Sequence, residues 1–111
     1  MIIITNPTTI QEIKEKHNNF FDNLVKIVID IEKETIAIDA ELHADLESYL
    51  LENDSEQQNL WGANIYIDKP NFIEFTSLIN IRPNQNNRSM EIQDDVLKIK
   101  IQNIVKKFIT W

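Results

Sequence analysis

Residues 60–83 read LWGANIYIDKPNFIEFTSLINIRP, and this stretch decides which fold the chain can adopt. Side chains of a β-strand alternate between the two faces of a sheet. In an extended conformation, one face would carry Trp61, Ala63, Ile65, Ile67, Ile73, Phe75, Ile79 and Ile81. The opposite face would carry Gly62, Asn64, Tyr66, Glu74, Thr76, Leu78, Asn80 and Arg82. The pattern predicts strands with one apolar face and one face that collects amide, carboxylate and guanidinium groups.

Turn residues divide the central stretch into shorter strands. The sequence DKPN at 68–71 is typical of a turn, so residues 60–67 and 72–76 are expected to pair as a hairpin. A further extended segment would continue to Arg82. Gly62 is the single glycine of the chain. A glycine inside a strand indicates a bulge or a close approach of another part of the chain.

The N-terminal half predicts a strand, a helix and a hairpin. The apolar run at residues 1–5 is typical of a buried strand. Thr9 followed by Glu12 forms a capping-box pattern, which predicts a helix over about residues 8–22. Residues 25–31 and 35–39 alternate around a polar turn and predict a hairpin.

Two further amphipathic helices are expected, at residues 41–53 and at about 92–109. The chain therefore predicts one α+β domain spanning residues 1–111. Its single sheet would be mixed or mostly antiparallel, with about five strands and three helices in the order β-α-β-β-α-β-β-α. We expect the helices to cover the apolar face of the sheet and to leave the polar face open.

Composition excludes several classes of function. The chain has no cysteine, which excludes disulfides, thiolate catalysis and cysteine-ligated metal centres. The net charge of −7 argues against binding to nucleic acid or to anionic membrane surfaces. No apolar run approaches the length needed to span a bilayer, and the start of the chain lacks a signal-type segment. We therefore expect a cytoplasmic protein.

The candidate binding residues come from the polar face, the helix beside it and the loop that follows. His43 and Glu47 are one helical turn apart, and Arg88 lies in the amide-rich loop after Pro83. Asp30 is either a charge protecting an edge strand or another member of the site. The candidate residues are His43, Glu47, Asn64, Glu74, Asn80, Arg82 and Arg88. Because His43 and Glu47 have no third partner by spacing, we expect no metal and no cofactor.

Three interpretations of this polar face remain open. In the first, it is a structural network in which Glu74 pairs with Arg82, or an interface of a homodimer. In the second, it recognises a peptide or a partner protein, because a carboxylate, a guanidinium and amides match a polar backbone. In the third, Glu74, Asp30 or His43 performs acid–base chemistry, although no nucleophile motif or phosphate loop is present. We favour the second interpretation, a small non-catalytic binding or accessory protein.

Three short motifs carry a resemblance to a known family. They are ELHAD at 41–45, LWGAN at 60–64, and INIRP at 79–83 followed by NRS at 87–89. With these motifs the chain resembles an uncharacterised family of small prokaryotic proteins that is known only as a domain of unknown function. It is also similar to small companions of radical-SAM enzymes that modify ribosomal peptides. That similarity implies an accessory role, in which the protein holds a precursor peptide or docks on the enzyme.

Overall fold

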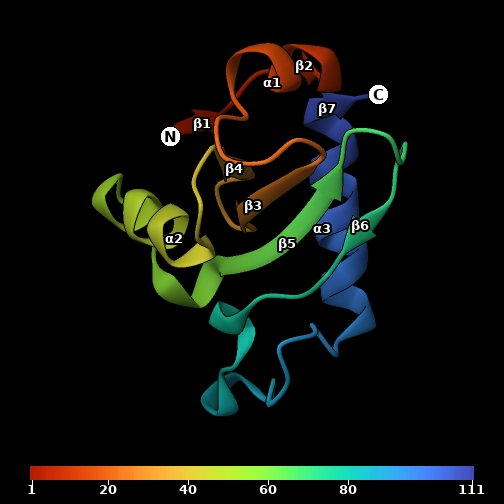
Figure 1. Cartoon of the computed structure of the whole chain (residues 1–111). Helices are drawn as coiled ribbons and strands as arrows, with labels where there is room; N and C mark the ends of the chain where they lie inside the picture. The colour runs from red at the N-terminus through yellow and green to blue at the C-terminus, as the bar shows by residue number, and fades with distance from the viewer.

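The computed structural model describes all 111 residues and contains one five-stranded antiparallel sheet (Figure 1). The strand order is β1-β4-β3-β5-β6. The strands are β1 (Ile2–Ile4), β3 (Leu24–Asp30), β4 (Thr35–Ile38), β5 (Leu60–Tyr66) and β6 (Ile73–Glu74). The predicted α+β class and the two predicted hairpins are confirmed: β3 pairs with β4, and β5 pairs with β6.

Three helices accompany the sheet, in the predicted order along the chain. They are α1 (Ile10–Lys16), α2 (His43–Glu52) and α3 (Asp95–Phe108). Two short strands that we did not predict, β2 (Thr8–Thr9) and β7 (Ile109–Thr110), pair in parallel. This pairing brings the start of α1 beside the end of α3, as the red and blue ends of the ribbon show in Figure 1.

Side-chain caps fix the start of two helices. Thr9 is the N-cap of α1 and accepts a hydrogen bond from the Glu12 amide at 3.1 Å. Asp94 is the N-cap of α3 and accepts from the amides of Val96 and Leu97. The first helix ends at Lys16, well before the predicted end at residue 22. Its C-cap is His17, whose amide donates to the Ile13 carbonyl, and Phe20 beyond it is 53 % exposed.

The sheet is apolar on both faces, and helices cover both of them. On one face, α1 and α3 pack against Ile27, Ile29, Trp61 and other residues of the larger core. On the opposite face, α2 places Leu46 and Leu50 against a smaller core that includes Val28, Ala37 and Leu60. The expectation that all helices cover one face and leave the other open is therefore wrong. Its physical reason is that Val28, Ala37 and Leu60 stand on the face that carries the polar groups of β5, so this face also has apolar surface to bury.

The segment 78–82 is not a strand, which corrects the sequence prediction. Residues Leu78–Asn80 form a 3₁₀ turn. Ile79 packs on the smaller core rather than the larger one, and Ile81 is 44 % exposed. The aliphatic alternation predicted for β5 is correct, because Trp61, Ala63 and Ile65 all face the larger core.

Gly62 explains how the 77–82 segment comes so close to β5. A Cβ atom at this position would lie 2.6 Å from the Ser77 Cβ and 2.8 Å from its Oγ. No carbon side chain fits at such distances, so only glycine lets the two segments meet there. The predicted close approach is thus confirmed. It also places Ser77 against β5, where Ser77 lines a groove described in the next subsection.

Candidate functional site

The predicted site residues separate into a polar row on the sheet, a cluster at the sheet edge and one exposed arginine. In the row, Lys26 of β3 stands opposite Asn64 of β5, and Asn64 stands opposite Glu74 of β6. Glu74 Oε1 accepts from Asn64 Nδ2 at 2.9 Å and from the Tyr66 hydroxyl at 3.0 Å. Burial, followed by the Glu74 carboxylate, raises the pKa of Tyr66 above its ordinary value. The row therefore holds Asn64 in one fixed orientation.

Asn80 belongs to the cluster at the sheet edge. Its side-chain amide bonds to the backbone of β5 as a neighbouring strand would. Its Oδ1 accepts from the Gly62 amide at 2.9 Å, and its Nδ2 donates to the Gly62 carbonyl at 2.9 Å. A second bond from Nδ2 reaches the Met90 carbonyl at 3.1 Å. Asn80 is fully buried, and these bonds satisfy the backbone of β5 beyond the point where β6 ends. Its amide atoms are engaged inside the protein.

Arg82 completes the edge of β5 in the same way. Its guanidinium donates to the carbonyls of Leu60, Gln57 and Ile79. It also forms an ion pair with Glu47 of α2 at 3.3 Å and lies over the Trp61 ring at 4.6 Å. Burial lowers the pKa of Arg82 and Glu47 opposes that shift, yet a guanidinium stays charged at neutral pH. The expected pairing of Arg82 with Glu74 is wrong, because Glu47 takes that place.

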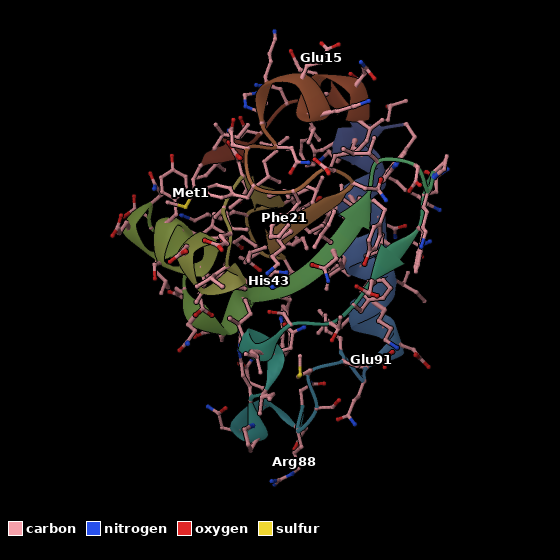
Figure 2. All side chains as sticks on the ribbon, in the orientation of Figure 1. Met1, Glu15, Phe21, His43, Arg88 and Glu91 are labelled. Carbon is pink, nitrogen blue, oxygen red and sulfur yellow. The ribbon has the colours of Figure 1, made fainter.

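Asp30 and Arg88 lie apart from both groups. Asp30 is fully buried on the central strand β3, so it protects no sheet edge. Its carboxylate accepts from the amides of Glu32 and Lys33 at 2.9 Å and from the Ser55 hydroxyl at 2.6 Å. Arg88 stands at the far end of the molecule and points into solvent (Figure 2). The sequence prediction that one surface unites all seven candidate residues is not what the structure shows.

A groove of about 370 Å³ joins His43 and Asn64, and it is the strongest candidate site. It lies between the first turn of α2, β5 and residues 76–79, and Figure 2 labels His43 where α2 meets β5. Its lining residues are Lys26, Leu42, His43, Ala44, Asn64, Thr76, Ser77, Leu78, Ile79 and Met90. Leu42, Leu78 and Met90 are 54 %, 70 % and 43 % exposed, so three large apolar side chains surround one opening. Such clustering on a small protein is typical of a binding surface.

These apolar members of the groove were not predicted from the sequence. One signal was available: Leu78 is a large aliphatic residue at a position assigned to the polar face of the central stretch. Leu42 lies within the helix predicted at residues 41–53, but it is the N-cap residue of α2 and is exposed. Met90 belongs to the loop, and no pattern in the sequence places a loop side chain.

His43 supplies a neutral imidazole to this groove. Its Nε2 lies 2.8 Å from the Ala63 carbonyl, which can only accept a hydrogen bond. The proton therefore resides on Nε2, and in the neutral ring Nδ1 is left as an acceptor. Burial lowers the pKa of His43 below 6.5, and Lys26 adds to that shift, while the Ala63 carbonyl and the Asn64 side chain oppose it. The imidazole is consequently uncharged at neutral pH.

Asn64 supplies an unpaired acceptor. Its side chain is only 8 % exposed, and its Oδ1 has no hydrogen-bond partner within the protein while the His43 ring is neutral; only a protonated ring would donate to it. Because Nδ2 is held by Glu74, the amide cannot rotate to exchange its two ends without losing that bond. A buried acceptor without a partner is costly, by about 1–3 kcal/mol. The groove thus contains a hydrogen-bonding capacity that the fold itself does not use.

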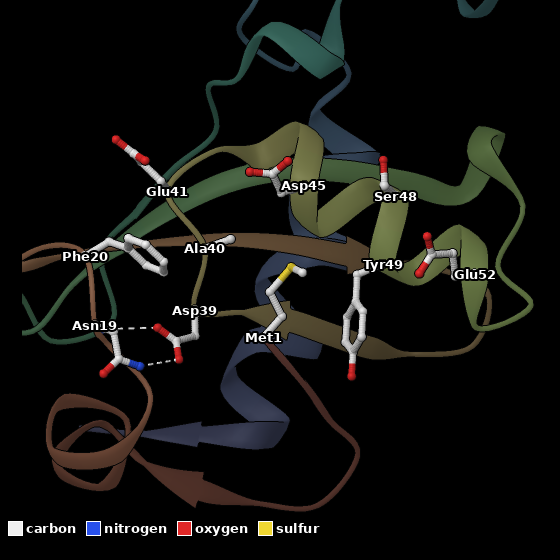
Figure 3. A pocket seen from close by; sticks show the side chains of 10 residues that line it. All are labelled: Met1, Asn19, Phe20, Asp39, Ala40, Glu41, Asp45, Ser48, Tyr49 and Glu52. Carbon is white, nitrogen blue, oxygen red and sulfur yellow. Dashed lines mark hydrogen bonds between the residues drawn. The ribbon is translucent and has the colours of Figure 1, made fainter.

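A second, more acidic hollow of about 490 Å³ lies on the other side of α2 (Figure 3). The carboxylates around it are Asp39, Glu41, Asp45 and Glu52, and the exposed side chains of Met1 and Phe20 border it. Asp39 accepts two hydrogen bonds from Asn19, at 2.9 and 2.6 Å. None of the side chains around this hollow has a buried polar atom without a hydrogen-bond partner, so the hollow adds acidic surface only.

Metal-binding clusters are absent, since no three His, Asp or Glu side chains lie close enough together to hold an ion. No helix is both long and apolar enough to cross a bilayer. The predicted cytoplasmic location stays a prediction.

Taken together, the sheet, the helices on its two faces and the groove at the start of α2 define a small α+β protein with one candidate recognition site. The chain belongs to the family described as protein of unknown function DUF5674, whose model matches residues 2–108. This match confirms the predicted membership of an uncharacterised family. No curated protein and no solved structure matches the chain, and the predicted similarity to companions of radical-SAM enzymes is not confirmed.

Proposed function

We propose that this protein is a binding module that holds an extended peptide segment in the groove formed by α2, β5 and residues 76–79. The observation that carries this proposal is the unpaired, buried Oδ1 of Asn64 beside three exposed apolar side chains. The segment would come from a free peptide or from a partner protein.

The hydrogen-bonding groups of the groove indicate what the occupant supplies. Asn64 Oδ1 and His43 Nδ1 are both acceptors, so the occupant needs donors. Lys26 also lines the groove and donates to the Glu41 carbonyl at 2.8 Å, and its remaining N–H groups match the carbonyl groups of a peptide. Backbone N–H groups are donors that every extended peptide presents at regular intervals.

The apolar groups of the groove favour an aliphatic or aromatic side chain on that peptide. Leu42, Leu78 and Met90 would be removed from water together when such a side chain enters. Each 100 Å² of apolar surface buried contributes about 2.5 kcal/mol before the cost of association. Methionine adapts its shape to different partners, which suits recognition of more than one sequence.

A selection from a random peptide library, followed by affinity measurements on synthetic peptides, tests the proposal. Leu78→Ser should weaken binding of the selected peptides by at least about tenfold, since one fully buried Leu contributes about 1.5–3 kcal/mol. Val96→Ser is the matched control, because Val96 on α3 is 75 % exposed and does not line the groove. Selected peptides that bind Leu78→Ser as tightly as the natural protein would overturn the proposal.

A second candidate function is acid–base catalysis, favoured by the environment of His43. A neutral imidazole with a free acceptor nitrogen, partly buried in a groove, is a suitable general base. No hydroxyl group within hydrogen-bonding distance of that imidazole is present to act as its nucleophile, so the substrate would have to supply the group that loses a proton. His43→Gln distinguishes the two functions, because a base is lost while the apolar contacts of a bound peptide remain.

The narrower hypothesis, that the peptide is a precursor held for a radical-SAM enzyme, rests on the sequence resemblance alone. It makes a specific prediction about binding: leader segments of such precursors should compete with the selected peptides. A homodimer that covers the same groove is the third alternative, and sedimentation at increasing protein concentration separates it from peptide binding.

A further inference from the structure

A third hollow, distinct from the groove and from the acidic hollow beside α2, is lined by the residue that carries the other unpaired buried polar group of the protein, Trp61. It has a volume of about 310 Å³ and lies where the 83–87 turn meets the start of α3. Its lining residues are Ile31, Gln58, Trp61, Gln85, Asn86, Asn87, Asp94 and Leu97. Trp61 is 4 % exposed, and its indole N–H has no hydrogen-bond partner. Because Trp61 and Asn64 point to opposite faces of β5, this hollow is separate from the groove of the proposed function.

Most polar side chains around this hollow are already engaged, which leaves a short list of groups for a ligand. Gln85 donates to the Gln58 carbonyl at 3.0 Å and accepts from Arg82 at 3.4 Å. Asn87 is buried and donates to carbonyls of the surrounding loop. These two residues line the hollow, and each already uses both its amide nitrogen and its amide oxygen within the protein.

Four groups retain capacity for a ligand. Gln58 is exposed and donates to the Glu56 carboxylate at 3.0 Å, which leaves its Oε1 as an acceptor. The Trp61 indole offers one donor. Asp94 uses Oδ1 to cap α3, and its Oδ2 makes no hydrogen bond. Asn86 is exposed in a left-handed conformation, with φ of 59°, and its side-chain amide makes no hydrogen bond. A ligand would meet one donor, two acceptors and an amide that serves as either, beside the apolar side chains of Ile31 and Leu97.

Charge narrows the class of ligand. Arg82 lies over the Trp61 ring, but its guanidinium is consumed by three carbonyls and by Glu47. No free cation lines the hollow, whereas Asp94 contributes a negative charge. An anionic ligand would therefore meet repulsion without compensation. An uncharged ligand whose acceptor and donor groups are neighbours on an apolar frame fits these constraints, and adjacent hydroxyls of a sugar have this pattern.

We propose that this hollow is a second binding site that takes a small uncharged polyhydroxyl ligand of the size of a monosaccharide. One hydroxyl oxygen accepts from the Trp61 indole, and a neighbouring hydroxyl donates to Asp94. The carbon skeleton packs against Ile31 and Leu97, while Asn86 fixes the orientation. The volume is at the lower end of the range of small-molecule sites, which suits one sugar unit.

Indole N–H resonances in a nitrogen-labelled sample test the proposal directly. The chain has two tryptophans, and Trp111→Phe assigns the Trp61 signal, since the Trp111 indole donates to the Tyr66 carbonyl. The probes are glucose, galactose, mannose and N-acetylglucosamine, with acetamide as an uncharged amide for comparison. At least one sugar should shift the Trp61 signal in a saturable way, and acetamide should not compete with it.

Two conservative variants make the test specific to this hollow. Asp94→Asn keeps a good N-cap for α3 and removes the charge, and Asn86→Gly keeps the left-handed backbone and removes the amide. Each should weaken sugar binding by about tenfold, because each removes one polar contact. A Trp61 signal that no sugar moves, that acetamide moves equally, or that shifts unchanged in both variants would overturn the proposal, leaving a bound water as the partner of the indole. None of these outcomes bears on peptide binding in the other groove.

Discussion

Two arginines of the same region of the chain differ sharply in their environments. Arg82 is 7 % exposed and bonds to three carbonyls and Glu47, whereas Arg88 is exposed and its side chain makes no contact of this kind. Arg82→Ala should lower the free energy of unfolding by about 3 kcal/mol, because it leaves a carboxylate and several carbonyls without a donor. Arg88→Ala should change it by less than about 0.5 kcal/mol. Urea denaturation measures both values, and equal effects would contradict the structural role of Arg82.

His43 should make the stability of the protein depend on pH. Its pKa in the folded protein lies below 6.5, chiefly because burial disfavours the charged ring. As pH falls below 6.5, the unfolded chain takes up a proton before the folded protein does. The free energy of unfolding should therefore decrease between pH 6.5 and the lower folded-state pKa, and it should be fully retained above that window.

Denaturation at a series of pH values in this window measures the effect. His43→Gln should flatten the dependence, since Gln does not titrate. Proton NMR of the His43 ring provides a direct check of the folded-state pKa. A ring that titrates at or above 6.5 in the folded protein would contradict the burial described for the groove.

Single-residue reasoning predicted some members of the site and not their roles. Asn64 and Glu74 could be placed on one face because the period of a strand is two, and they do bond to each other. Asn80 and Arg82 were placed by the same period, but their segment is not a strand. A side chain can bond to a backbone edge from many loop conformations, so alternation alone could not assign them to Gly62 and Leu60.

At the scale of elements, strong periodicity was enough to predict the helices and the hairpins. Residues 41–53 and 92–109 contain α2 and α3, because each pattern buries one continuous stripe. The sequence could not show on which face of the sheet each helix packs. Both faces of β3 carry apolar side chains, as Ile27 and Val28 illustrate, and this choice depends on connections between distant segments.

The contact between β5 and the 77–82 segment yields a prediction about Gly62. Gly62→Ala should lower the free energy of unfolding by about 1–3 kcal/mol, because the new Cβ would lie 2.6 Å from the Ser77 Cβ. Ser77→Gly removes that Cβ, so the double variant should recover part of the loss. A thermodynamic cycle from urea denaturation gives the coupling between the two sites. Additive effects would contradict the close approach, and so would a Gly62→Ala variant of unchanged stability.

At the scale of the whole molecule, one sheet is shared by two cores. Neighbouring residues of β5 serve different cores, since Leu60 faces α2 and Trp61 faces α3. Loss of either core removes support from the same strand, so neither face can unfold while the other persists. This arrangement predicts that the 111 residues unfold as one cooperative unit.

Leu46→Ala in α2 and Ile104→Ala in α3 test this coupling from opposite faces. Both side chains are buried, so each variant should lose about 2–5 kcal/mol of unfolding free energy. Tryptophan fluorescence reports mainly on the larger core, and far-ultraviolet circular dichroism reports on all helices. In each variant the two signals should change in a single transition with one midpoint. A Leu46→Ala protein in which circular dichroism is lost before fluorescence would instead show that α2 detaches on its own, and the groove would then open independently of the rest of the sheet.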